Sequence, residues 1–256
     1  MPRLLVIVLL AGLVAGLLVG GFHNLFTVPV IERAMDFEEE QTLAGAGGLA
    51  AAKDAEPTLS RGEQRVGMAV GTVFFGLIFG LYFAGGYSLL RRVVPGWQPL
   101  ALTLTVGALG FWALSLFPFI KYPLNPPGVG EQGNLAVSQV AQAVFLFLLS
   151  PAGVLGILLG FQRVNSLRAL MRDRIGLYGL VLVAYGAFAA AIFFALPTRS
   201  DSAEVPIDLL ELFRTLTMVG QFLLWALLGI GVALALMWYQ RRAQQDLGSR
   251  KIRQGV

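Results

Sequence analysis

Polar and apolar positions in this chain are segregated into long blocks. Six apolar stretches approach or exceed the roughly 20 residues that a helix needs to cross a bilayer. They lie at about 4–22, 66–90, 100–117, 137–161, 175–196 and 215–239. A backbone in lipid must satisfy its hydrogen bonds internally, so each stretch is interpreted as a helix. The pattern predicts an all-α, polytopic integral membrane protein with six transmembrane helices in a single membrane domain over residues 1–256.

The polar segments between these stretches differ in character. Residues 23–65 begin with an acidic run and continue with many Ala and Gly residues. They predict an extracytoplasmic acidic, flexible loop with room for a short helix near 38–43. Residues 240–256 form a basic tail. The first apolar stretch is longer than the apolar region of a usual signal peptide, so we expect an uncleaved anchor.

Prolines predict where the helices break. The segment 117–130, FPFIKYPLNPPGVG, contains four prolines within ten positions. Because proline lacks an N–H and disfavours helix at the preceding residue, the third span is expected to stop at Phe117 and to become a stiff, extended loop. This loop is either a rigid connector or part of a binding entrance. Pro151 lies inside the fourth span, where it should bend the helix and leave a carbonyl for a neighbour to satisfy.

Glycine spacing predicts which helices pack closely. Gly12, Gly16 and Gly20 recur every four residues and so share one face of the first helix. The second span carries two more pairs at this spacing, Gly67/Gly71 and Gly76/Gly80. Small residues at such positions let two backbones approach each other in a membrane.

The distribution of charged residues predicts the orientation of the chain in the membrane. If the polar segments are assigned alternately to two sides, 12 of the 19 basic residues fall with the termini and 13 of the 15 acids fall opposite. The 12 are Arg3, Arg91, Arg92, Arg163, Arg168, Arg172, Arg174, Arg241, Arg242, Arg250, Lys251 and Arg253. Lys and Arg collect in cytoplasmic loops, so we expect both termini in the cytoplasm. The outer face would then be strongly negative and would concentrate cations.

Composition narrows the possible functions. Hydrophobic residues make up 56% of the chain and charged residues 13%, with no cysteine, which excludes disulfides and thiolate metal sites. No phosphate-binding GxxxxGK motif is present, and the basic residues flank spans, so neither ATP hydrolysis nor nucleic-acid binding is expected. We find no acidic, basic or histidine residue deep in the six apolar cores and no plausible nucleophile–base pair. We therefore expect no enzyme and no proton-coupled antiporter of the usual kind.

One segment contains candidate metal ligands. His23, the only histidine, is followed by Glu32, Asp36, Glu38, Glu39 and Glu40. Imidazole and carboxylate groups suit divalent Co, Ni, Mn or Zn without choosing among them. The alternative is an interfacial histidine beside a solvated acidic turn. No resident cofactor is expected, because the cation would be cargo.

Several segments resemble the CbtA family, the large membrane subunit of a proposed cobalt transporter. They are KYPLNPPGVG at 121–130, PVIERAMDFE at 29–38, RVGMAVGTVFFGLIFGLYFAGGY at 65–87 and VPIDLLELFRTLTMVGQFLLWALLG at 205–229. In the last, Phe213, Arg214, Gln221 and Trp225 occupy the family's Phe-Arg, Gln and Leu-Trp places. The resemblance implies a multi-pass subunit of a cobalt uptake system in the cytoplasmic (inner) membrane, paired with a small, histidine-containing, CbtB-like membrane subunit.

The resulting hypothesis is a membrane subunit for uptake of cobalt or a similar divalent cation. The acidic segment with His23 would attract the cation, and glycine-packed helices, mainly the second, would form the path. The predicted entrance and path residues are Lys121, Tyr122, Asn125, Arg214 and Gln221. Two alternatives remain at this point: a permease for another solute such as nickel, and a non-transporting scaffold or assembly subunit.

Overall fold

A computed structural model describes residues 2–45, 61–126, 135–167, 170–197 and 206–254. All of the regular elements in these ranges are helices, and six of the helical segments are long and apolar enough to cross a membrane. The elements are α1 (Pro2–Phe22), η1 (His23–Thr27), α2 (Val28–Gly45), α3 (Arg61–Val93), α4 (Pro99–Phe111), η2 (Trp112–Leu116), α5 (Phe117–Lys121), α6 (Leu135–Val144), η3 (Phe145–Leu149), α7 (Ser150–Ser166), α8 (Met171–Ala195) and α9 (Ile207–Gln254). The predicted all-α fold with six spans is confirmed.

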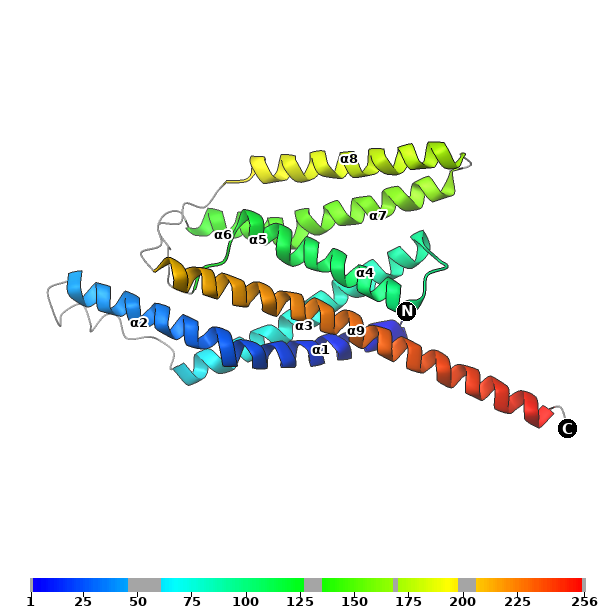
Figure 1. Ribbon diagram of the computed structural model, residues 1–256, viewed down its shortest axis with the longest axis horizontal. Coiled ribbons are helices and arrows are strands. Elements are labelled where there is room, and N and C mark those ends of the chain that lie inside the picture. The colour runs from blue at the N-terminus through cyan, green and yellow to red at the C-terminus, as the bar shows by residue number, and fades with distance from the viewer. Residues whose placement is uncertain (1, 46–60, 127–134, 168–169, 198–205, 255–256) are drawn as a thin grey trace.

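The spans run back and forth along the long axis of the molecule (Figure 1). α9 packs against α1 on one side and α4 on the other, and α3 closes the bundle against α1, α4 and α7. α8 packs mainly on α7 and has no buried residue, so it lies at the edge of the bundle.

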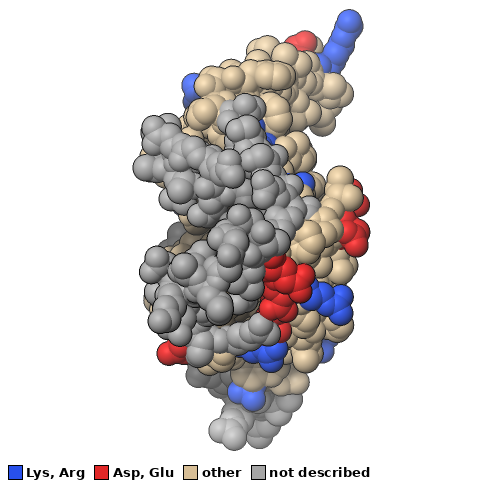
Figure 2. Space-filling view, turned by 90° about the vertical axis from the view of Figure 1, so that its left-hand side faces the viewer, with Lys and Arg blue, Asp and Glu red and all other residues tan. Residues whose placement is uncertain are grey.

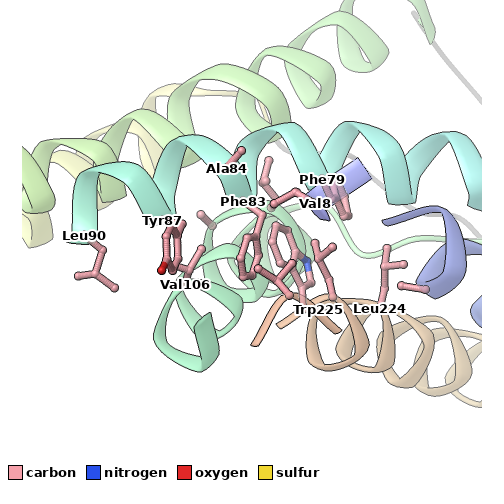
Figure 3. Packing of buried hydrophobic residues seen from close by; sticks show 14 of the residues in the cluster. Val8, Phe79, Phe83, Ala84, Tyr87, Leu90, Val106, Leu224 and Trp225 are labelled. Carbon is pink, nitrogen blue, oxygen red and sulfur yellow. The ribbon is translucent and has the colours of Figure 1, made fainter. Parts of the chain in front are cut away.

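The main hydrophobic core lies where α1, α3, α4 and α9 meet. Trp225 is buried in it and stacks on Phe79, with 5.0 Å between ring centroids (Figure 3). Gly110 makes room for this indole, since a Cβ atom on Gly110 would lie 2.2 Å from the Trp225 ring. A large aromatic side chain from α9 therefore fills a notch that a glycine opens in α4.

The glycines of α1 and the middle of α3 pack backbone against backbone. A Cβ on Gly12 would lie 2.4 Å from the carbonyl oxygen of Gly76, and the reverse distance is 2.3 Å. The predicted close approach is thus confirmed for this part of the pattern. Gly67 and Gly71 have no atom within 4 Å of such a Cβ among the described residues. The expectation that glycine-packed helices, mainly the second, form a cation path stays a prediction.

Three prolines lie inside continuous helices, each two residues after a short π-helix. Pro29, Pro118 and Pro151 follow η1, η2 and η3 in this way. The residue before each proline donates its N–H to a carbonyl five positions back, in the pairs Val28–His23, Phe117–Trp112 and Ser150–Phe145. A proline ring clashes with the carbonyl four residues earlier. The wider π-turn accommodates that clash without ending the helix.

Several predicted boundaries were therefore wrong. The third span does not stop at Phe117, because the helix continues through Pro118 to Lys121. The predicted loop at 23–65 is helical as far as Gly45 and again from Arg61, while residues 46–60 lie outside the described part of the chain. The last span belongs to one long helix, Ile207–Gln254, which also includes Asp208 and Glu211 before the span and much of the basic tail after it.

Candidate functional site at the acidic end

One end of the bundle, here called the acidic end, is formed by α2, the start of α3, the segment after α5, the end of α8 and the start of α9. Figure 2 looks onto this end, where Asp and Glu side chains gather next to Lys and Arg side chains. All the predicted site residues whose side chains are described lie at this end or just inside it. The side chains of Glu38 and Glu39 lie outside the described residues.

The carboxylate of Glu32 is held by Arg65. The Nη2 atom of Arg65 donates to both oxygens of Glu32 at 2.9 and 3.1 Å, and its Nε atom donates to Oε1 at 3.2 Å. Such a two-pronged contact joins α2 to the start of α3. A cation that bound Glu32 would therefore have to replace a guanidinium.

His23 lies at the junction of α1 and α2 and is buried. Its Nδ1 atom is 2.8 Å from the Thr27 hydroxyl, one helical turn on. The other edge of the ring lies against Gly220 of α9, where a Cβ would come within 2.4 Å of Cε1 and Nε2. The sequence predicts a first span that ends at residue 22, whereas the structure places His23 inside the continuous helical segment Pro2–Phe37.

The predicted metal ligands are not assembled into a site by the described side chains. Among these residues, no three His, Asp or Glu side chains lie close enough together to hold one ion. Glu32, Asp36 and Glu40 stand on α2, four residues apart, so they follow one face of that helix toward its end. A metal site that includes Glu38 and Glu39 stays a prediction.

The proline-rich segment is attached to the end of α8. Lys121 is buried, and its ammonium donates to the Leu196 carbonyl at 3.1 Å and lies 4.8 Å from the Phe193 ring centroid. Tyr122 donates its hydroxyl to the Pro197 carbonyl at 2.8 Å. Burial raises the pKa of the Tyr122 hydroxyl, so it remains a donor. The Lys121 cation thus compensates the negative end of the α8 dipole.

The same segment is attached to α9 by Arg214. The guanidinium donates to the Leu124 carbonyl at 3.2 Å and to the Asn125 side-chain oxygen at 2.7 Å. The predicted entrance residues Lys121, Tyr122, Asn125 and Arg214 therefore do come together. In the described contacts the donors of Lys121, Tyr122 and Arg214 bind carbonyl and amide oxygens, which holds residues 121–125 against α8 and α9.

Gln221 lies deeper, in a polar chain that links α9 to η2. The Ser115 hydroxyl donates to the Gln221 oxygen at 3.0 Å, and the indole N–H of Trp225 donates to Ser115 at 3.1 Å. A serine or threonine hydroxyl in a helix can instead bond a carbonyl of its own helix. Thr103 does so, with its hydroxyl 3.0 Å from the Leu100 carbonyl. Only the packing of η2 against α9 distinguishes the two cases.

The six apolar helical segments and these contacts define a polytopic α-helical membrane protein with an acidic end. Inside that end, polar groups contact α9 at the neighbouring residues Gly220 and Gln221. His23 lies against the first and Ser115 bonds the second. Imidazole, carboxylate and amide oxygen are groups that bind divalent transition metals.

Comparison with known proteins adds the family. Residues 1–237 match the CbtA family, described as probable cobalt transporter subunit, and the chain belongs to this family. No curated protein and no solved structure matches the chain. The resemblance stated from the sequence is confirmed, and the family is one of transporter subunits rather than of enzymes.

Proposed function

We propose that this chain is the large membrane subunit of an uptake transporter for a divalent cation, with cobalt as the cargo. The family supports the class of protein. The observation that carries the proposal for this chain is the gathering of carboxylates at one end of a bundle whose core is apolar. By the distribution of Lys and Arg, that end faces outward from the cytoplasmic membrane, with both termini inside.

Capture begins at the carboxylates of α2. A negative surface raises the local concentration of cations. The proposed ligands are His23, Glu32, Asp36, Glu38, Glu39 and Glu40. Because Arg65 holds Glu32 in the absence of a cation, its guanidinium would compete with the cargo for this carboxylate. That competition would weaken binding, and weak binding allows the ion to move on.

The cationic residues shape the entrance without binding the cargo. Lys121 and Arg214 carry positive charge and would repel a divalent cation at short range. Their contacts to Leu196, Leu124 and Asn125 fix the proline-rich segment between α8 and α9. The cation would pass on the carboxylate side of this segment and then meet the oxygen of Gln221.

A partner subunit supplies what this chain lacks. The chain has one histidine and no nucleotide-binding motif. A small, histidine-containing, CbtB-like membrane protein would provide further imidazole ligands. The energy for uptake would come from the membrane potential or an ion gradient, since an inward cation current is driven by a potential that is negative inside.

The test is cobalt accumulation at limiting external metal in cells that carry this chain alone, with the partner, or neither. We expect uptake only with both chains. Glu32→Gln should lower uptake at limiting metal, whereas Arg65→Gln, which frees the carboxylate, should maintain or raise it. Asp173→Asn, which removes an exposed carboxylate at the opposite end, is the matched control and should change nothing.

Two results would contradict the proposal. Unchanged uptake after joint replacement of His23, Glu38, Glu39 and Glu40 by alanine would exclude the acidic capture site. No uptake in any combination, with insertion of both chains verified, would exclude cobalt transport and favour a scaffold role. Competition of cobalt uptake by excess nickel would distinguish a cobalt-selective system from a nickel permease.

A further inference from the structure

A pocket at the opposite end of the bundle combines two arginines with an apolar wall. It has a volume of about 460 Å³ and lies between the start of α1, the end of α3 and the later part of α9. These three segments meet at the end where the chain begins (Figure 1). Its lining residues are Leu4, Tyr87, Ser88, Arg91, Arg92 and Leu236.

The depth of this pocket is that of a membrane interface. Leu236 lies less than one helical turn before Trp238 and Tyr239, which are both exposed on α9. Exposed aromatic residues next to arginines are typical of the headgroup level. Arg242 stacks on Trp238 at 4.0 Å, and Arg3 lies 5.4 Å from the Tyr239 ring. The pocket therefore opens at the level where lipid headgroups end and acyl chains begin.

The charge of the pocket selects an anion. Arg91 and Arg92 are exposed, and within the described part of the chain neither has a carboxylate at ion-pair distance. They stand in the last turn of α3, where the helix dipole favours positive charge. Two guanidinium groups would repel a divalent cation, so this pocket does not lie on the route of the proposed cargo.

We infer that this pocket binds the phosphate of an anionic phospholipid, with Arg91 and Arg92 on the phosphate and Leu4 and Leu236 beside the first part of the acyl chains. Guanidinium groups bind phosphate oxygens in a planar, two-pronged geometry. The hydroxyl of Ser88 already donates to the Ala84 carbonyl at 2.7 Å, so the two guanidinium groups supply the donors for the phosphate oxygens. Basic pockets between transmembrane helices are a known way of binding anionic headgroups.

The experiment uses the full chain, purified in a neutral detergent, and follows the midpoint of thermal unfolding. The additions are phosphatidylglycerol, phosphatidylcholine or inorganic phosphate. We expect phosphatidylglycerol to raise the midpoint more than phosphatidylcholine does. In R91Q/R92Q the apparent affinity for phosphatidylglycerol should fall roughly thirtyfold, since each basic residue near an anionic surface contributes about a factor of five.

The matched control is R163Q/R172Q, which removes two exposed arginines from α7 and α8 at the same end. It should keep the wild-type response, and an equal loss there would overturn the inference in favour of general surface charge. A response to inorganic phosphate as large as that to phosphatidylglycerol would identify a free anion as the ligand and overturn the lipid assignment. If R91Q/R92Q does not fold, Leu4→Trp fills the apolar part with both arginines in place. A full phosphatidylglycerol response in that variant would refute the pocket.

Discussion

The Tyr82 hydroxyl donates to a backbone carbonyl that Pro151 leaves without its helical donor. The Phe147 carbonyl is four residues before Pro151, which has no N–H to donate, and the Tyr82 hydroxyl donates to it at 2.8 Å. Tyr82→Phe removes this donor and leaves the carbonyl without it inside the membrane. We predict a clear loss of stability, and we predict that Pro151→Ala, which restores a backbone N–H, abolishes most of that loss.

The size of the effect follows from the part-buried position of this hydrogen bond among apolar helices. An unsatisfied buried acceptor costs about 1–3 kcal/mol, and hydrogen bonds between transmembrane helices average about 0.6 kcal/mol. We therefore expect Tyr82→Phe to cost about 1 kcal/mol in the wild-type chain. In the Pro151→Ala background the cost should be roughly 0.3 kcal/mol or less, because the carbonyl then has its own helical donor.

The assay is the free energy of unfolding in mixed micelles, measured for the four members of this double-mutant cycle. Tyr87→Phe is the matched control. Tyr87 is a buried tyrosine on the same helix, and no hydrogen bond of its hydroxyl is seen among the described residues. It should change stability by less than about 0.5 kcal/mol. An equal cost of Tyr82→Phe in both backgrounds would refute the assignment of this hydroxyl to the proline-freed carbonyl.

Three further predictions test the helix packing by thermal unfolding. Gly76→Ala should lower the free energy of unfolding by about 1–3 kcal/mol, because its Cβ would meet backbone at 2.3 Å. Gly71→Ala places its Cβ in open space and should change stability little. Equal effects of these two substitutions would contradict the packing of α1 on α3. Gly220→Ala should destabilise by a similar 1–3 kcal/mol through its clash with the His23 ring, and His23→Ala should remove that penalty. Trp225→Ala should cost about 3–5 kcal/mol, and a loss below 1 kcal/mol would exclude it from the core.

The proline pattern shows how far local chemistry predicts structure. From the sequence it followed that Pro151 frees a carbonyl, because this is a property of the residue itself. That the donor is Tyr82, 65 positions away, is a fact of helix packing. For Pro118 the local rule predicted a helix end, and the prediction was wrong because a π-turn accommodates the ring.

The candidate site was only partly predictable for the same reason. The family segments identified Lys121, Asn125 and Arg214, and the structure brings them together through α8 and α9. No signal in the sequence indicated that Arg65 would hold Glu32. An ion pair between residues 33 positions apart depends on how two helices are placed.

The sequence alone determined the number of spans, the membrane setting, the segregation of charge to two ends and the family. These follow from hydropathy, composition and short motifs, which act locally or add along the chain. The tertiary structure decided which glycines pack, which carboxylates are paired and which carbonyls are satisfied. The physical reason is that each of these depends on short-range contacts between helices, and such contacts are set by the mutual fit of distant segments.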